Sequence, residues 1–119
     1  MRKRALVLVA GTIIAFASMT SAFAAVPSTI SIGYNHDTEF FHGVVGSSNT
    51  ECQAGRVVKV YKETSNGPSL QGRVMSNADG SWKVEVMHAG GHYFALVPAE
   101  KVMHTHCGRA KSRSVDVMM

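Results

Sequence analysis

The sequence predicts an all-β protein, an antiparallel β-sandwich of about seven short strands with one disulfide bond. Three observations support this prediction. After residue 25, apolar residues recur at every second position in short runs, and neither a 3.6-residue period nor a heptad repeat is present. Glycine, proline, asparagine and aspartate separate the runs. The chain also has only two cysteines, Cys52 and Cys107, which lie 55 positions apart.

Residues 1–24 are predicted to be a secretory signal peptide. Residues 2–4 are basic, residues 5–17 carry no charge and are mostly apolar, and Ala22 and Ala24 are the small residues that signal peptidase requires. The alternative is an uncleaved membrane anchor. The apolar run is short for a hydrocarbon core of about 30 Å, so we expect cleavage after Ala24, no membrane anchor in the mature protein, and a secreted or periplasmic location.

The rest of the chain, residues 25–119, has the length of one small domain, and we expect a single β-sandwich. The chain holds 12 Lys and Arg against 8 Asp and Glu. Three of the basic residues belong to the predicted signal peptide, which leaves nine basic and eight acidic side chains, a formal charge of +1. A nucleic-acid-binding domain needs a basic stripe. This charge balance indicates none, and we expect no nucleic-acid partner.

The two cysteines are predicted to form a disulfide bond. Export places Cys52 and Cys107 in an oxidising compartment, where a disulfide persists. A small domain buries a modest core, so a covalent link adds stability that it needs. Closing a loop of this length contributes about 4 kcal/mol in the chain-entropy model. The alternatives are two free thiols or two thiolate metal ligands.

The first half of the domain contains four predicted strands. Ile30 and Ile32 alternate with small residues, and Val58 and Val60 alternate with lysines. The fourth strand follows a turn at residues 65–68, which combine asparagine, glycine and proline. We expect strands at residues 30–34, 41–45, 56–62 and 71–75.

The second half has the clearest alternation. Asp79 and Gly80 form a turn, because this dipeptide readily adopts positive φ. After the break at Gly91, the next strand ends before Pro98. We expect strands at residues 81–87, 93–97 and 115–117. The residues predicted to face the core are Ile30, Ile32, Val58, Val60, Trp82, Val84, Val86, Tyr93, Ala95 and Val97.

Two stretches resemble a known family pattern. Residues 76–84 read Ser-Asn-Ala-Asp-Gly-Ser-Trp-Lys-Val, and residues 91–97 read Gly-His-Tyr-Phe-Ala-Leu-Val. This order resembles transthyretin-like (prealbumin-like) sandwiches, which include the carboxypeptidase regulatory-like domains and the B-type repeats of bacterial collagen adhesins. Residues 41–45 and 52–62 are similar to the opening strands of bacterial secreted members, in which an early cysteine pairs with one near the last strand.

The resemblance implies an Ig-like or transthyretin-like sandwich over residues 28–118, with Cys52 bonded to Cys107. The matching residues are core and turn residues, so they support the fold and carry little functional information. Members of this group mostly serve as spacers, adhesive modules or accessory binding domains.

Four histidines suggest a metal site as the alternative function. His88 follows Met87 in the sequence and His104 follows Met103, and thioether with imidazole suits copper in an oxidising compartment. A copper or zinc site would use His88, His92, His104 and His106. The other interpretation is that these are surface histidines without a ligand, and on that interpretation the protein has no cofactor.

Alternation also predicts an apolar interaction face. If Tyr93 and its alternate neighbours point inward, then Phe94 and Leu96 point outward, and by the same argument so do Phe40 and Val44. Four such side chains exposed on one sheet would bind a partner. The alternatives are that loops such as residues 99–105 cover them, or that one strand has the opposite register.

The sequence predicts no enzyme. One transthyretin-like hydrolase of the purine pathway ends in Tyr-Arg-Gly-Ser, whereas this chain ends in Val-Asp-Val-Met-Met at residues 115–119. No serine or cysteine nucleophile arrangement and no glycine-rich phosphate loop is recognisable. We therefore expect a non-catalytic interaction or structural module whose partner is an unknown protein or surface ligand.

Overall fold

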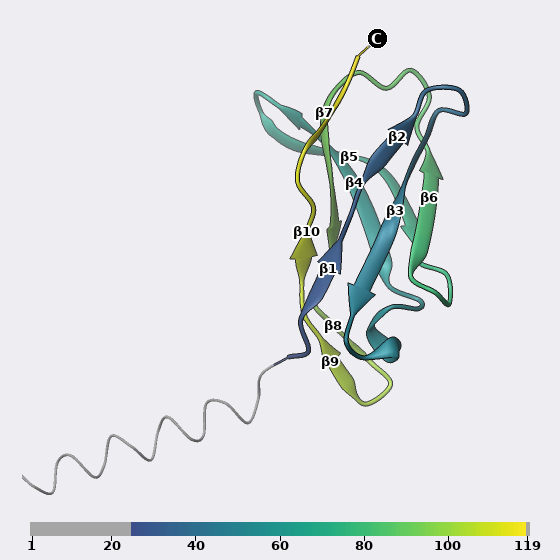
Figure 1. The fold of residues 1–119 in the computed structure, drawn as a ribbon. Helices are drawn as coiled ribbons and strands as arrows, with labels where there is room; N and C mark the ends of the chain where they lie inside the picture. Colours follow the sequence, from purple (N-terminus) through teal and green to yellow (C-terminus); the bar gives the residue numbers. More distant parts are fainter. Residues whose placement is uncertain (1–24, 119) are drawn as a thin grey trace, which may run out of the picture.

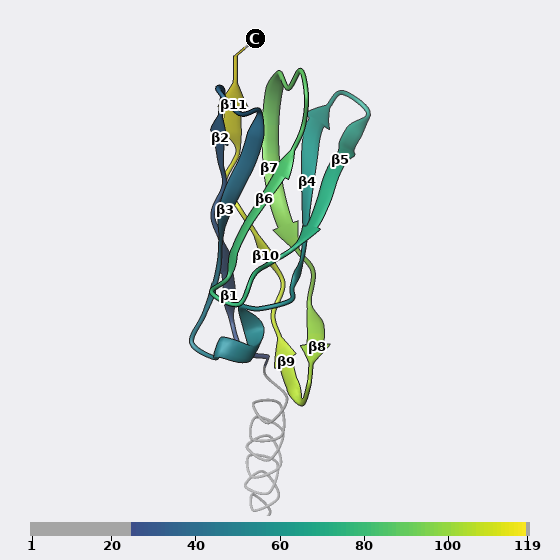
Figure 2. The same ribbon diagram turned by 90° about the vertical axis from the view of Figure 1, so that its right-hand side faces the viewer.

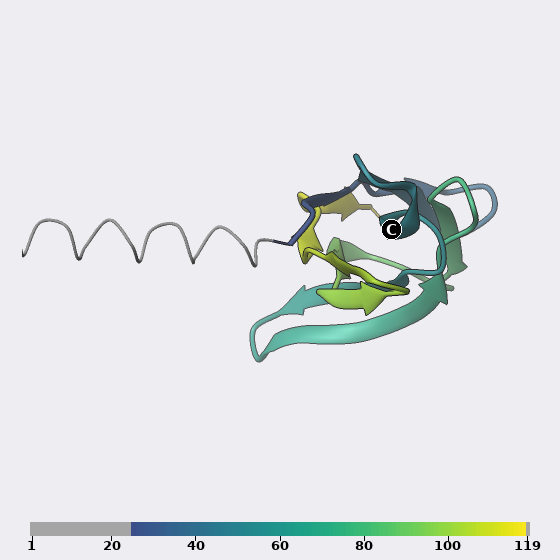
Figure 3. The ribbon, with the colours of Figure 1, turned by 90° about the horizontal axis from the view of Figure 1, so that it is seen from below.

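The protein is an all-β sandwich of two facing sheets, as predicted. The computed structural model describes residues 25–118, and the predicted signal peptide at residues 1–24 lies outside this range. Figure 1 shows one sheet in front of the other, and Figure 2 shows the two layers edge-on. Seen from below, the layers face each other across the core (Figure 3).

The first layer is a four-stranded antiparallel sheet around a central strand β3. Strands β1 and β2 pair with successive parts of one edge of β3, and β6 pairs with the other edge. This sheet consists of β1 (Ser28–Ile30), β2 (Gly33–Asn35), β3 (Phe40–Ser47) and β6 (Ser81–Glu85).

The single strand predicted at residues 30–34 is interrupted where it passes Gly43. A Cβ atom built on Gly43 would lie 1.9 Å from the carbonyl oxygen of Ser31, so only glycine allows this approach. The Ser31 amide still donates to the Val44 carbonyl (3.1 Å), and the Val44 amide donates to Ser31 Oγ (3.0 Å). The interruption therefore keeps both halves on the same edge of β3.

The second layer is a five-stranded antiparallel sheet with β7 and β4 at its centre. Strands β10 and β11 pair with one edge of β7, β4 pairs with the other edge, and β5 pairs with β4. This sheet consists of β4 (Val57–Thr64), β5 (Gly67–Met75), β7 (Gly91–Val97), β10 (Ala110–Lys111) and β11 (Val115–Val117).

The predicted turn at residues 77–80 is confirmed, but it joins the two sheets rather than two neighbours of one sheet. It connects β5 of the second layer to β6 of the first. Gly80 has a φ of +91°, and its carbonyl accepts from the Val45 amide (2.8 Å). Gly91, with a φ of +112°, begins β7 after the chain has crossed back to the second layer.

The core lies between the layers and contains the predicted inward set. Seven of those ten residues are buried, and Ile30, Ile32 and Val84 are half-buried and pack against them. Phe41 and Val45 of β3 are fully buried, and Ala89 and Val117 complete the cluster. Phe41 also contacts Tyr93 of the opposite sheet, with ring centroids 4.8 Å apart.

The lower end of the sandwich holds elements that alternation did not predict. A 3₁₀-helix, η1 (Thr50–Cys52), follows β3, and a two-stranded hairpin is formed by β8 (Glu100–Val102) and β9 (Thr105–Cys107). Figure 1 shows this hairpin below the two sheets. The predicted disulfide is present, with Cys52 Sγ and Cys107 Sγ joined, and it links η1 to the end of β9.

Within residues 25–118, no helix is long and apolar enough to span a membrane.

Candidate binding face

The structure does not bring the four candidate metal-binding histidines together. His88 and His92 lie around the β6–β7 connection at one end of the sandwich, whereas His104 and His106 lie on the β8–β9 hairpin at the other end (Figure 1). Among the described residues, no three His, Cys, Asp or Glu side chains are grouped to hold a metal ion. The predicted four-histidine copper or zinc site is therefore wrong, because the β8–β9 hairpin and the β6–β7 connection do not approach each other.

The predicted interaction face is also corrected, because its four residues belong to two sheets. Phe40 and Val44 lie on β3 of the four-stranded sheet, and Phe94 and Leu96 lie on β7 of the five-stranded sheet. Each pair points away from the core, so the two pairs lie on opposite outer faces. Burial differs as well, since Val44 is 49% exposed and Phe94 is only 6% exposed.

Neighbouring side chains of the five-stranded sheet cover Phe94. The Tyr61 ring of β4 stacks on the Phe94 ring with centroids 5.4 Å apart and an interplanar angle of 19°. The Lys111 ammonium of β10 lies 4.4 Å from the Phe94 ring centroid. The contacts that cover Phe94 therefore include side chains of its own sheet, from β4 and β10.

An apolar row crosses the outer face of the five-stranded sheet. Leu70 of β5 is opposite Tyr61 of β4, and Tyr61 is opposite Phe94 of β7. Residues directly opposite in neighbouring antiparallel strands point to the same side of the sheet. Leu70 is 52% exposed. We call Leu70, Tyr61 and Phe94 the apolar row.

A cationic row runs beside the apolar row, two residues further along each strand of the β4–β7 pair. Arg73 of β5 is opposite Lys59 of β4, Lys59 is opposite Leu96 of β7, and Leu96 is opposite Lys111 of β10. Three of these four side chains are positively charged. We call Arg73, Lys59, Leu96 and Lys111 the cationic row.

The surface beside Phe94 is hollowed where the two rows reach β7 and β10. Two hollows of about 200 and 420 Å³ share Pro68, Phe94 and Lys111 as lining residues. The larger also includes Leu96 and Arg109. The charged residues that line the larger hollow, Arg109 and Lys111, are both basic, whereas the smaller hollow is lined by Glu63 as well as Lys111. The larger hollow, with its apolar floor, suits a ligand with apolar and acidic groups.

The outer face of the four-stranded sheet is less basic. Lys83 of β6 lies over the Phe40 ring, with its Nζ atom 5.4 Å from the ring centroid. His42 of β3 is directly opposite Lys83. The His42 ring packs on Gly33, where a Cβ atom built on the glycine would lie 2.9 Å from His42 Cε1. Glu85 of β6 is opposite Phe40. This face thus carries one lysine and one acid beside the half-buried Phe40 and the exposed Val44.

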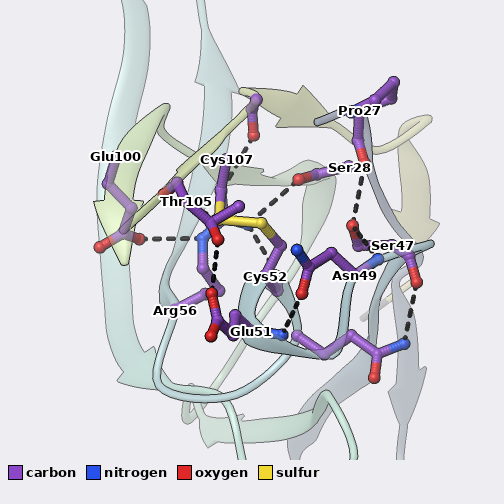
Figure 4. The surroundings of a disulfide bond; sticks show 12 residues. Pro27, Ser28, Ser47, Asn49, Glu51, Cys52, Arg56, Glu100, Thr105 and Cys107 are labelled. Atoms are coloured by element: carbon purple, nitrogen blue, oxygen red, sulfur yellow. Dashed lines mark hydrogen bonds and ion pairs between the residues drawn. A yellow bond between two sulfur atoms is a disulfide. The ribbon is translucent and has the colours of Figure 1, made fainter. Parts of the chain in front are cut away.

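Arg56 is a buried site residue that sequence reasoning missed. Its side chain is fully buried directly before β4, and each of its N–H groups has a partner. Figure 4 shows Arg56 beside the disulfide with its partner Glu100. Nε donates to Glu100 Oε1 at 3.0 Å. The guanidinium also donates to four oxygens at 2.8–3.1 Å: Ser28 Oγ and the carbonyls of Cys52, Pro98 and Gly108.

These bonds make Arg56 the connector of the lower end of the sandwich. It joins β1, the disulfide loop, the β7–β8 link, β8 and the segment after β9. The Arg56 amide itself donates to Ser76 Oγ (2.9 Å). Glu51 of η1 also accepts a hydrogen bond from Thr105 of β9. The cluster is saturated, so it is a structural feature rather than an open site.

Comparison with protein-family models, curated proteins and solved structures finds no match to this chain.

Proposed function

We propose that this protein is a non-catalytic interaction domain that binds a partner with the outer face of its five-stranded sheet. The observation that carries the proposal is the combination of the apolar row and the cationic row on one face. In a sheet with one face in solvent, each strand ordinarily places apolar side chains toward the core and polar side chains toward the solvent. Neighbouring apolar side chains on the solvent face, rimmed by polar ones, mark interaction sites.

The proposed location is a secreted or periplasmic compartment. Residues 1–24 read as a signal peptide, and the Cys52–Cys107 disulfide fits an oxidising environment. The transthyretin-like pattern of residues 76–97 adds the proposal that the domain belongs to that group, whose members mostly bind or space other proteins. No observation favours a catalytic role as a second candidate.

Photo-cross-linking from matched positions tests the binding face. A benzophenone amino acid replaces Leu70 on the five-stranded sheet in one variant and Val44 on the four-stranded sheet in the other. These residues are 52% and 49% exposed, so the two probes have equal access to solvent. The variants are expressed in the exporting cell, and adducts are separated by mass.

The proposal predicts a discrete adduct from position 70 that is absent from position 44. Adding Leu96→Ser to the position-70 variant should weaken that adduct, because Leu96 lies in the neighbouring row. Equal adducts at both positions, an adduct only at position 44, or no adduct at either position would overturn the proposed face.

A further inference from the structure

The cationic row breaks a rule of sheet stability. Like charges directly opposite each other on neighbouring strands destabilise a sheet by about 0.2–1 kcal/mol, and Lys59 is directly opposite Arg73. Among residues 25–118, the ion pairs are Arg56–Glu100 and His92–Asp116, so no acid lies within ion-pair distance of the row. A pair of like charges that lowers stability and has no acidic partner within the domain indicates a functional role for these residues.

The charge distribution over the two layers supports an anionic ligand. The domain as a whole is nearly neutral, yet Arg73, Lys59 and Lys111 share one outer face, and Arg109 lines the hollow beside them. The acids of this sheet lie beyond the apolar row, where Glu63 is opposite Pro68 and Asp116 is opposite His92. An anionic group would therefore bind at the cationic row.

The spacing of the row matches an extended peptide. Strands lie about 4.8 Å apart, so the three steps from Arg73 to Lys111 span about 14 Å. In an extended chain, residues i and i+4 are about 13 Å apart, and i, i+2 and i+4 share one side. A peptide with acids at alternate positions can thus face the cationic row, while the residues between them face the apolar row.

The aromatic residues disfavour a sugar or a nucleic-acid base. Such ligands stack on a free aromatic face. The Phe94 ring already contacts the Tyr61 ring and the Lys111 ammonium, which come from the strands on the two edges of β7. A peptide with branched apolar side chains needs no free ring face, since it can pack against Leu70 and the ring edges.

We propose that the partner presents an extended acidic segment with alternating apolar residues, which lies across strands β5, β4, β7 and β10 along the boundary between the cationic and apolar rows. Its carboxylates pair with Arg73, Lys59 and Lys111, and its apolar side chains pack on the apolar row. This inference rests on the proposed function, because it takes the five-stranded face as the binding face.

A fluorescent peptide tests this ligand class directly. The probe is fluorescein-labelled Glu-Leu-Glu-Leu-Glu, titrated with the full mature protein to about 1 mM and followed by anisotropy. The matched control peptides are Lys-Leu-Lys-Leu-Lys, which reverses the charge, and Glu-Gly-Glu-Gly-Glu, which removes the apolar groups. A sulfated polysaccharide and a thymidine oligonucleotide represent the other anionic classes.

Variants on the two faces locate the binding. Lys59→Gln with Arg73→Gln should weaken binding of the Glu-Leu peptide by about tenfold or more, because two charge pairs are lost. The control Lys83→Gln with Lys101→Gln removes the same charge elsewhere and should leave affinity within about twofold. Thermal denaturation of each variant establishes that it is folded. Affinity for the wild type should fall with added salt.

Saturable binding of the Glu-Leu peptide, lost in the Lys59–Arg73 double variant and kept in the control, would support the inference. Tighter binding of the polysaccharide or oligonucleotide would overturn the peptide class. Absence of peptide binding, while position 70 still forms its cross-link, would overturn the acidic ligand and leave the binding face standing. Absence of both would remove the proposed function as well.

Discussion

Arg56 and Arg73 lie on or beside neighbouring strands and carry the same charge, but their surroundings are opposite. Arg56 is fully buried and donates five hydrogen bonds to protein oxygens. Arg73 is exposed and stands opposite Lys59, with no acidic partner among the described residues. A cation whose donors are all used stabilises the fold, whereas a cation beside another cation is available for a ligand.

The largest expected effect is at the end of the sandwich that Arg56 organises. Replacing both cysteines, Cys52→Ala with Cys107→Ala, should lower the free energy of unfolding by about 4 kcal/mol, because the unfolded chain regains the freedom of a long loop. Urea denaturation measures this loss, and chemical reduction of the wild type should reproduce it. A loss below about 1 kcal/mol would mean that the Arg56 cluster holds this end without the bridge.

Arg56→Lys should give the next largest effect. Lysine keeps the charge but has three donors on one nitrogen, so it cannot reach five oxygens arranged around a planar guanidinium. We expect a loss of about 3 kcal/mol in the free energy of unfolding, since buried acceptors and Glu100 lose partners.

The matched control is Arg73→Lys on the exposed face. This change keeps the charge of an unpaired side chain, so the free energy of unfolding should stay within about 0.5 kcal/mol of the wild type. If the two Arg→Lys variants lose equal stability, the contrast between the buried and the exposed arginine is wrong.

Arg73→Gln should raise stability by about 0.5 kcal/mol at low salt, because it removes the like-charge pair with Lys59. Denaturation in low and high salt measures the difference, which should shrink as ions screen the repulsion. Lys83→Gln is the control, since Lys83 lies over Phe40 and its removal should give no gain. A lower stability of Arg73→Gln would show that Arg73 already has a favourable partner.

Alternation predicted the core but could not assign strands to sheets. The side-chain period shows that Phe94 and Tyr93 point to opposite sides of β7, and the structure confirms it. Whether β3 and β7 share a sheet depends on every crossing between them, at residues 48–56, 76–80 and 86–90, and the sequence does not reveal these crossings. The Asp79-Gly80 turn, for example, fits either a hairpin or a crossing. For this reason the apolar face predicted from Phe40 and Phe94 was divided between two layers.

The binding face depends on register, which the sequence alone does not reveal. Lys59, Arg73 and Lys111 are far apart along the chain, and each is an ordinary outward residue of its own strand. Only the pairing of β5, β4, β7 and β10 places them in one row. Arg56 gave no signal for a similar reason, since its acceptors come from segments that meet only after folding.

The smallest effect concerns Asp79, an exposed charge that has local partners. Its Oδ1 atom accepts from the Ser81 hydroxyl (2.6 Å) and the Ser81 amide (3.0 Å). The Ser81 side chain and then its amide lower the pKa of Asp79 from the usual 3.8. A lowered pKa in the folded state contributes stability above pH 3.8, and this contribution is lost as the pH falls from 3.8 through the lower, folded-state value.

Ser81→Ala should therefore return the pKa of Asp79 toward its usual value, because it removes the hydroxyl that is the main cause of the shift. A carboxyl NMR titration of wild type and variant measures the change. The amide donor remains, so the return should be partial, whereas Asp79→Asn should abolish the titration. An unchanged pKa in Ser81→Ala would mean that the loop amide alone holds the carboxylate. The exposed carboxylate of Asp79 would then be stabilised by a backbone amide of its own turn. Arg73 lies within β5 rather than in a turn, so it has no such local partner.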